Sequence, residues 1–167
     1  MLSNEAILGL SNARQQIIIL PTEKCNFRCV YCYEDFSVGK MSEETLISIE
    51  KMISRRAEQV QYLNIGWFGG EPLLQARIVE RISNHAQEAM RNTSGRFDGS
   101  ITTNGYLLTR GLATRLCKAG VTKYQITLDG SKESHDKTRV LKGGGPSFDV
   151  IWKNLTELKD SNLNFSI

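Results

Sequence analysis

The chain has 167 residues, enough for one domain with a hydrophobic core. Its 21 Lys and Arg against 18 Asp and Glu give a formal charge of +3, and no basic block suggests a nucleic-acid partner. No apolar run approaches the roughly 20 residues of a membrane span, and the N-terminus lacks the cationic start of a signal peptide. We therefore expect a cytoplasmic protein with neither a membrane nor a nucleic acid as partner.

Short β-like runs alternate with stretches of helical periodicity along the chain. The first run, QIIIL at residues 16–20, is apolar without a break after its first residue, which is typical of a strand buried on both faces. The further predicted strands are 61–68, 100–102 and 123–128, and a fifth begins at 164–167.

The helix predictions rest on end signals and on apolar residues three or four positions apart. Ser42 can cap the first helix, Pro72 suits the first position of the second, and Gly120 suits the end of a third over 109–119. A fourth follows the flexible loop 143–145. The four apolar faces contain Leu46, Ile49, Ile53 and Ala57; Leu74, Ile78, Ile82 and Ala89; Leu112, Ala113 and Leu116; and Phe148, Ile151, Leu155 and Leu158.

Repeated strand-then-helix units imply a parallel sheet with right-handed crossovers. About four complete βα units and a started fifth strand predict an α/β fold that forms a partial (β/α) TIM-like barrel. We expect residues 1–167 to be a single core domain. Because domain boundaries normally fall in polar linkers, an end inside a predicted strand indicates truncation at the C-terminal end.

Three of the four cysteines lie within eight residues, directly after the first predicted strand. Cys25, Cys29 and Cys32 form a C-x3-C-x2-C spacing in CNFRCVYC. Three thiolates on one loop can hold three irons of a [4Fe–4S] cluster and leave the fourth iron without a protein ligand. Such an open position suggests substrate chemistry, as it does in catalytic zinc sites. Cys117 lies far away in a helical pattern and is expected to be a small buried hydrophobe.

This spacing, with aromatic Tyr31 before the third cysteine, resembles the signature of the radical S-adenosylmethionine (SAM) superfamily. The wider stretch PTEKCNFRCVYCYE resembles its SPASM-type, peptide-modifying branch, which includes anaerobic sulfatase-maturating enzymes. The resemblance covers roughly residues 16–155. Three further matches follow predicted strands, where barrel enzymes build their active sites: Gly69-Gly70-Glu71-Pro72, Thr103-Asn104-Gly105 and Thr127-Leu128-Asp129-Gly130.

The resemblance implies a [4Fe–4S] cluster held by the three cysteines, with SAM chelating the open iron. An electron donor such as a flavodoxin or ferredoxin would reduce the cluster, and a 5′-deoxyadenosyl radical would then abstract hydrogen from a peptide or protein substrate. No residue is assigned to catalysis. The residues implied to contact SAM or support its pocket are Tyr31, Gly69, Gly70, Glu71, Pro72, Asn104, Thr127, Asp129 and Arg139.

Several of these residues have plainer alternatives. The segment 69–72 can be a simple strand-to-helix turn, and Tyr31 can be an aromatic packed beside a cluster. Asp129 can be a turn residue before a glycine, and Arg139 can be solvated surface.

Two alternatives for the whole chain also stay open. The cysteines could form a structural zinc site, although zinc would want a fourth ligand. We expect His85 at the edge of the core and His135 in a loop, and neither is spaced as that ligand. Alternatively, the chain could be a degenerate domain that acts in binding or regulation.

Overall fold

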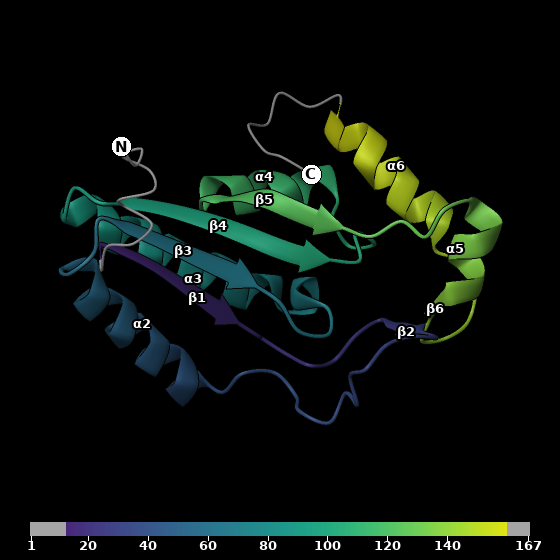
Figure 1. The fold of residues 1–167 in the computed structure, drawn as a ribbon, viewed down its shortest axis with the longest axis horizontal. Coiled ribbons are helices and arrows are strands. Elements are labelled where there is room, and N and C mark those ends of the chain that lie inside the picture. The colour runs from purple at the N-terminus through teal and green to yellow at the C-terminus, as the bar shows by residue number, and fades with distance from the viewer. Residues whose placement is uncertain (1–12, 160–167) are drawn as a thin grey trace, which may run out of the picture.

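The computed structural model describes residues 13–159, so the strand expected at 164–167 lies outside the described residues. Four parallel strands form one sheet in the order β1-β3-β4-β5 (Figure 1). They are β1 (Arg14–Ile19), β3 (Tyr62–Trp67), β4 (Arg96–Thr103) and β5 (Val121–Ile126). The prediction of an α/β fold with a parallel sheet, part of a TIM-like barrel, is confirmed.

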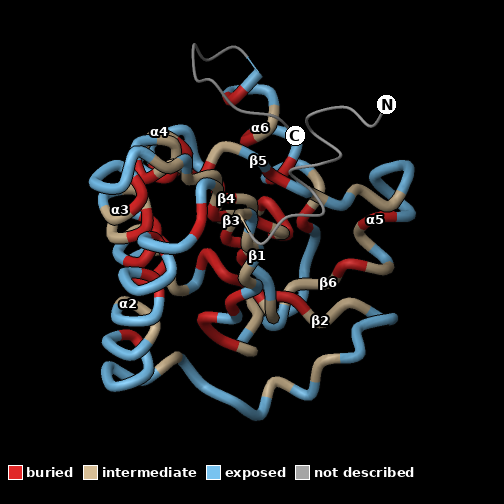
Figure 2. Tube along the Cα trace, turned by 60° about the vertical axis from the view of Figure 1, so that its left-hand side comes forward, coloured by how far each residue is buried: buried red, intermediate tan, exposed pale blue. Residues whose placement is uncertain are grey.

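Three helices cover one face of this sheet: α2 (Glu43–Ala57), α3 (Ala76–Asn92) and α4 (Arg110–Lys118), as Figures 1 and 2 show. The core lies between these layers and includes Leu63, Ile65, Trp67, Ile101, Ile53, Val79, Ile82, Ala86, Met90 and Leu116. Every second residue of β3, and of β4 from Gly99 onward, faces this core, in keeping with the period of two.

The opposite face of the sheet is open within the described residues. Ile18 of β1 is 64% exposed and Leu20 is 43% exposed, whereas Ile19 is buried. The expectation that residues 16–20 are buried on both faces was therefore wrong. The reason is that helices pack on one side of the sheet only (Figure 2), and Ile18 of this edge strand lines the hollow on the other side.

The helix ends follow their local signals closely. Ser42 accepts a hydrogen bond from the backbone of Thr45, and Thr109 does the same for Leu112. Gly120 follows α4 with φ +82°, a conformation that glycine adopts without strain. Pro72 instead begins a short 3₁₀ helix, η1 (Pro72–Gln75), ahead of α3. Leu74 in this segment is 39% exposed, so it does not belong to the buried face of α3 as expected.

A small second sheet lies beyond the carboxyl ends of the four strands (Figure 1). In it β2 (Phe27–Cys29) pairs antiparallel with β6 (Arg139–Leu141). Helices α5 (Lys132–Thr138) and α6 (Phe148–Lys159) flank β6 in the chain. Only α6 was predicted, because the other elements have three to seven residues and carry no periodic apolar pattern.

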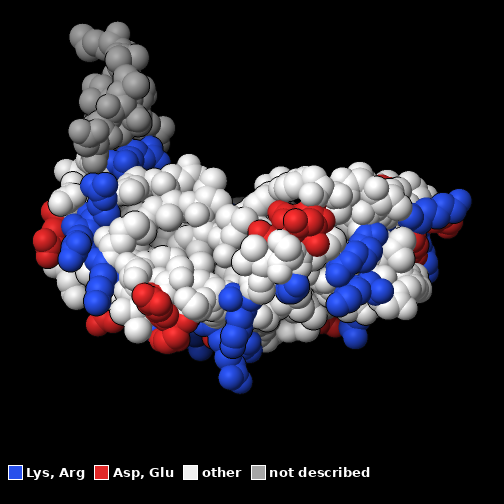
Figure 3. Space-filling view, turned by 90° about the horizontal axis from the view of Figure 1, so that it is seen from below, with Lys and Arg blue, Asp and Glu red and all other residues white. Residues whose placement is uncertain are grey.

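No helix among residues 13–159 is both long and apolar enough to cross a membrane. Basic and acidic side chains are interspersed on the face that Figure 3 shows.

Candidate functional site

The three clustered cysteines lie at the carboxyl edge of the parallel sheet. Cys25 follows β1, Cys29 ends β2, and Cys32 lies in the turn after it. The Phe27 backbone N–H donates to Cys25 Sγ at 3.3 Å, and the Cys32 N–H donates to the Cys29 carbonyl at 3.1 Å. Burial raises the pKa values of the Cys25 and Cys29 thiols, while Cys32 is exposed. The loop therefore carries three free thiols at three separate backbone positions.

These thiols do not converge on one point. No group of three His, Cys, Asp or Glu side chains within residues 13–159 is placed to hold a single metal ion. An iron–sulfur cluster takes its thiolate ligands on separate irons, so it needs no such convergence.

The Gly69-Gly70 pair packs against the backbone that leads into the cysteine loop. Gly70 N–H donates to the Thr22 carbonyl at 3.2 Å, and Glu71 N–H donates to the Lys24 carbonyl at 3.0 Å. A Cβ on Gly70 would lie 2.1 Å from the Glu23 carbonyl oxygen, closer than any real contact. Gly70 is thus required by the close approach of two backbone segments.

Glu71 is fully buried, and its carboxylate is bonded within the chain. One oxygen accepts from Leu73 N–H at 2.9 Å and from the Thr103 hydroxyl at 2.7 Å. The other oxygen accepts from Asn104 N–H at 2.8 Å. Burial raises the pKa of Glu71, and these hydrogen bonds oppose the rise. Pro72, which follows, is also buried and is the first residue of η1.

Asn104 connects the end of β4 to the cysteine loop. Its side-chain amide donates to Asn26 Oδ1 at 2.8 Å and lies 3.9 Å from Cys25 Sγ, within hydrogen-bonding range of sulfur. Its own Oδ1 accepts from Tyr106 N–H at 3.0 Å. This side chain therefore supports the first cysteine directly.

A second group of predicted residues meets beside β2 and β6. Arg139 Nη1 donates to the Tyr31 hydroxyl at 2.7 Å, and that hydroxyl donates to Asp129 Oδ2 at 2.8 Å. The Thr138 hydroxyl donates to the same carboxylate oxygen at 2.8 Å. Burial by itself would raise the pKa of the Asp129 carboxyl. These hydrogen bonds act in the opposite direction, and the pKa is lowered overall. Thr127 is exposed just beyond β5.

Arg139 is buried, only 8% exposed, so of its two readings the alternative of a solvated surface residue is wrong. It pairs with Cys29 in the register of the small sheet. Its Nε is buried with no hydrogen-bond partner, the only such side-chain atom within residues 13–159. Because buried polar groups are almost always satisfied, an unpaired guanidinium nitrogen beside a cysteine fits an anionic ligand group such as the SAM carboxylate.

The expectation that His135 lies in a loop was also wrong, because it is a fully buried residue of α5. Its Nδ1 accepts from Asp129 N–H at 3.3 Å, and its Nε2 lies 3.1 Å from the Ser147 hydroxyl. Burial lowers the pKa of His135, and the charge of Arg139 adds to this effect. His85 lies at the core edge as expected, with Nε2 2.9 Å from the Ser54 hydroxyl.

Four residues of this site were not singled out from the sequence: Thr103, Thr138, Asn26 and Ser147. Thr103 and Asn26 stood inside quoted motifs, but Thr138 and Ser147 did not, and only the contacts of the folded chain identify the roles of all four.

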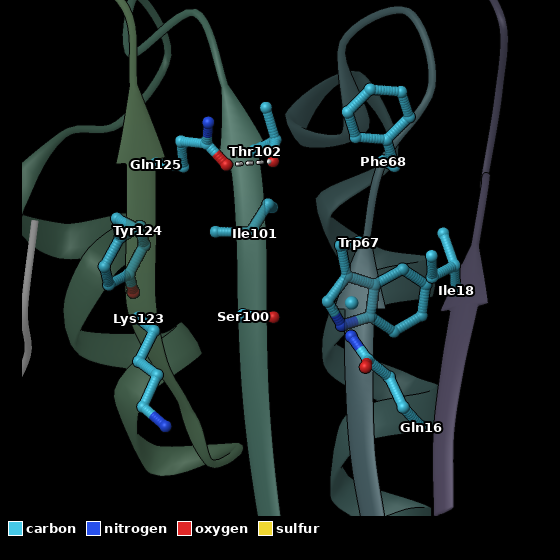
Figure 4. A pocket seen from close by; sticks show the side chains of 11 residues that line it. Gln16, Ile18, Trp67, Phe68, Ser100, Ile101, Thr102, Lys123, Tyr124 and Gln125 are labelled. Carbon is cyan, nitrogen blue, oxygen red and sulfur yellow. Dashed lines mark hydrogen bonds between the residues drawn. The ribbon is translucent and has the colours of Figure 1, made fainter.

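The open face of the sheet forms a hollow of about 400 Å³ next to this site (Figure 4). Among residues 13–159, the side chains that line it are neutral apart from Lys123. Lys123 is already paired with Asp98. The lining includes Gln16, Ile18, Phe68, Ser100, Thr102 and Gln125.

Comparison with known proteins agrees with this geometry. The model of the Radical SAM superfamily matches residues 19–167. The chain therefore belongs to the radical SAM superfamily. That family uses a [4Fe–4S] cluster and SAM, so the expected cofactor pair is confirmed at the level of the family.

Several relatives are named as enzymes. The chain is 25% identical to the Fe-coproporphyrin III synthase of Methanosarcina barkeri, over 96% of this chain and 38% of that protein. It is 29% identical to a GTP 3′,8-cyclase of Desulforamulus reducens, over 86% of this chain and 42% of that protein. The prediction of a radical SAM enzyme is confirmed for the family.

Among solved structures, the fold resembles that of anSMEcpe with bound AdoMet and the Cp18Cys peptide, with a TM-score of 0.78 and 25% identity. That match covers 91% of this chain and 42% of the other. The chain thus spans about half or less of the length of these relatives. They differ in what they act on, so the matches do not separate the peptide-modifying branch from the others.

Proposed function

We propose that this chain is the cluster-binding and SAM-binding part of a radical SAM enzyme that modifies a peptide or protein. One observation carries the cofactor part: three free thiols and a buried arginine with an unpaired Nε lie together at the carboxyl edge of a half-barrel. When bound, the cluster and SAM supply a radical that abstracts a hydrogen atom.

The residues of the chain divide into three roles. Cys25, Cys29 and Cys32 would each hold one iron, and Arg139 would pair with the carboxylate of SAM through its free Nε. The Tyr31 hydroxyl holds Arg139 in place through the hydrogen bond described above, and Asp129 in turn holds this hydroxyl. Backbone carbonyls of Gly69 and Gly70 would accept from the SAM ammonium.

The proposed substrate class rests on the hollow in Figure 4 and on one structural relative. Amides and hydroxyls such as Gln16, Ser100 and Gln125 can hydrogen-bond to backbone amide groups of a peptide. The structure of anSMEcpe contains a peptide together with AdoMet. A nucleotide triphosphate is less well matched, because the hollow offers one lysine and that lysine is paired.

The first experiment is anaerobic reconstitution of the purified chain. We expect about four irons and four sulfides per chain, with the paramagnetic resonance of the reduced cluster shifted by SAM. Cys29→Ala should abolish the cluster, while Cys117→Ala, the matched control on α4, should keep it. Stoichiometric zinc, or a cluster indifferent to SAM, would contradict the proposal.

The substrate class needs a separate assay. SAM cleavage should be stimulated by members of a peptide library and not by GTP. Stimulation by GTP alone would move the proposal to the cyclase branch. The electron donor, a flavodoxin or ferredoxin, and the cytoplasmic location stay predictions.

A further inference from the structure

The buried carboxylate of Glu71 lies at the centre of the contacts that link three separate segments. It joins η1 to the end of β4 through Leu73 N–H, the Thr103 hydroxyl and Asn104 N–H. Its own backbone N–H bonds to Lys24, just before the first cysteine. Both carboxylate oxygens therefore accept hydrogen bonds from the chain itself. Glu71 thus fixes the positions of Leu73, Thr103 and Asn104 relative to one another.

The bond from Asn104 N–H has a consequence at the cysteine loop. It fixes the backbone of Asn104, whose side chain then reaches Asn26 at 2.8 Å and Cys25 Sγ at 3.9 Å. A continuous path of hydrogen bonds thus runs from Glu71 through Asn104 to the first cysteine. The three residues follow β1, β3 and β4, so they lie at the edge of the sheet where these strands end.

We propose that Glu71 is a positioning residue that holds Asn104 against Cys25 and so orients this thiolate for the cluster. The inference deepens the proposed function and rests on it only for the statement that Cys25 is a cluster ligand. The role differs from direct contact with SAM, because Glu71 is 0% exposed and its oxygens are occupied. Residues behind metal ligands commonly orient them in this way.

The chain offers variants that separate this role from a general loss of stability. Glu71→Gln puts an NH₂ group against one of the two backbone N–H groups, because an amide has a single acceptor oxygen. Thr103→Val keeps the carboxylate but removes the hydroxyl that donates to Glu71 and accepts from Gly105 N–H at 3.2 Å, while Thr103→Ser keeps this hydroxyl. Ser83→Ala is the matched control. It leaves the buried Trp67 Nε1, now 3.2 Å from the Ser83 hydroxyl, without a partner at a point outside this path.

The first readout uses the cluster-free chain, so it does not depend on the proposed function. Each thiol is alkylated, and its rate is followed by peptide mass spectrometry, with exposed Cys32 as the internal reference. We expect Glu71→Gln to raise the rate at Cys25 about tenfold relative to Cys32, since an unpaired buried donor loosens the segment. Ser83→Ala should leave this ratio unchanged.

The Thr103 pair removes an electrostatic ambiguity. Glu71→Gln also takes a negative charge from beside Cys25, and that charge contributes to the raised pKa of the thiol. Thr103→Val keeps the charge, so an increased ratio in this variant, with recovery in Thr103→Ser, assigns the effect to position. It also provides the test if Glu71→Gln fails to fold.

The second readout uses the reconstituted cluster. Iron loss to a chelator should be about 10–100 times faster in Glu71→Gln and in Thr103→Val, and near the original rate in Thr103→Ser and Ser83→Ala. The proposal is overturned if the Cys25-to-Cys32 ratio in Glu71→Gln and Thr103→Val equals that in Ser83→Ala. If the alkylation result holds but no variant, including the original chain, binds a cluster, the proposed function fails and the positioning role stands.

Discussion

A methyl group added at Gly70 tests the close approach on which the site depends. In Gly70→Ala the new Cβ would lie 2.1 Å from the Glu23 carbonyl oxygen and 2.6 Å from that of Lys24. The Glu23 carbonyl oxygen must move away from this Cβ by about 1.3 Å to reach ordinary van der Waals contact. Overpacking of this kind costs about 1–3 kcal/mol, and each of the two backbone hydrogen bonds across the gap contributes about 1 kcal/mol. We expect a loss of about 3 kcal/mol in the free energy of unfolding.

Thermal unfolding of the cluster-free chain, followed by circular dichroism, measures this loss. For a chain of this size, 1 kcal/mol corresponds to about 2–4 °C, so Tm should fall by about 6–12 °C. Gly66→Ala is the matched control on β3, because its nearest contact would be 3.7 Å, and its effect should stay within about 0.5 kcal/mol. Equal Tm values for the two variants would refute the reasoning that backbone contact requires glycine at position 70.

Three further predictions address a helix cap, the core and pH. Ser42→Ala should cost about 1 kcal/mol, because Thr45 N–H at the start of α2 loses its acceptor; an unchanged Tm would contradict this. Ile82→Ala, a fully buried site on α3, should cost about 2–5 kcal/mol in urea unfolding, and a loss below 1 kcal/mol would mean a looser core. Because the folded-state pKa of His135 is lowered, the unfolded chain binds its proton first, and stability should fall as pH drops below about 6.5. In His135→Gln this part of the pH dependence should disappear, and a slope equal to that of the original chain would exclude His135 as its source.

Most of the parallel sheet was predictable because local signals and burial agree there. Leu63, Ile65 and Trp67 alternate along β3 and pack on the helices, and Ser42 caps α2 as its type suggests. The exposed face of β1 was not predictable in the same way. A run of apolar residues predicts that a strand forms. Whether helices cover one face of that strand or both depends on elements distant in the sequence.

The sequence by itself predicted the chemistry proposed for this protein, from three thiols at a fixed spacing after a strand. The spacing of residues along one loop is a local property, so it can be interpreted without knowledge of the fold. The tertiary structure alone decided which side chains support that chemistry. Arg139 is separated from Tyr31 by more than a hundred residues, yet they share a hydrogen bond of 2.7 Å because β2 and β6 pair. Likewise Glu71 reaches Asn104 only because parallel strands β3 and β4 end side by side, which brings their following loops together at one edge of the sheet.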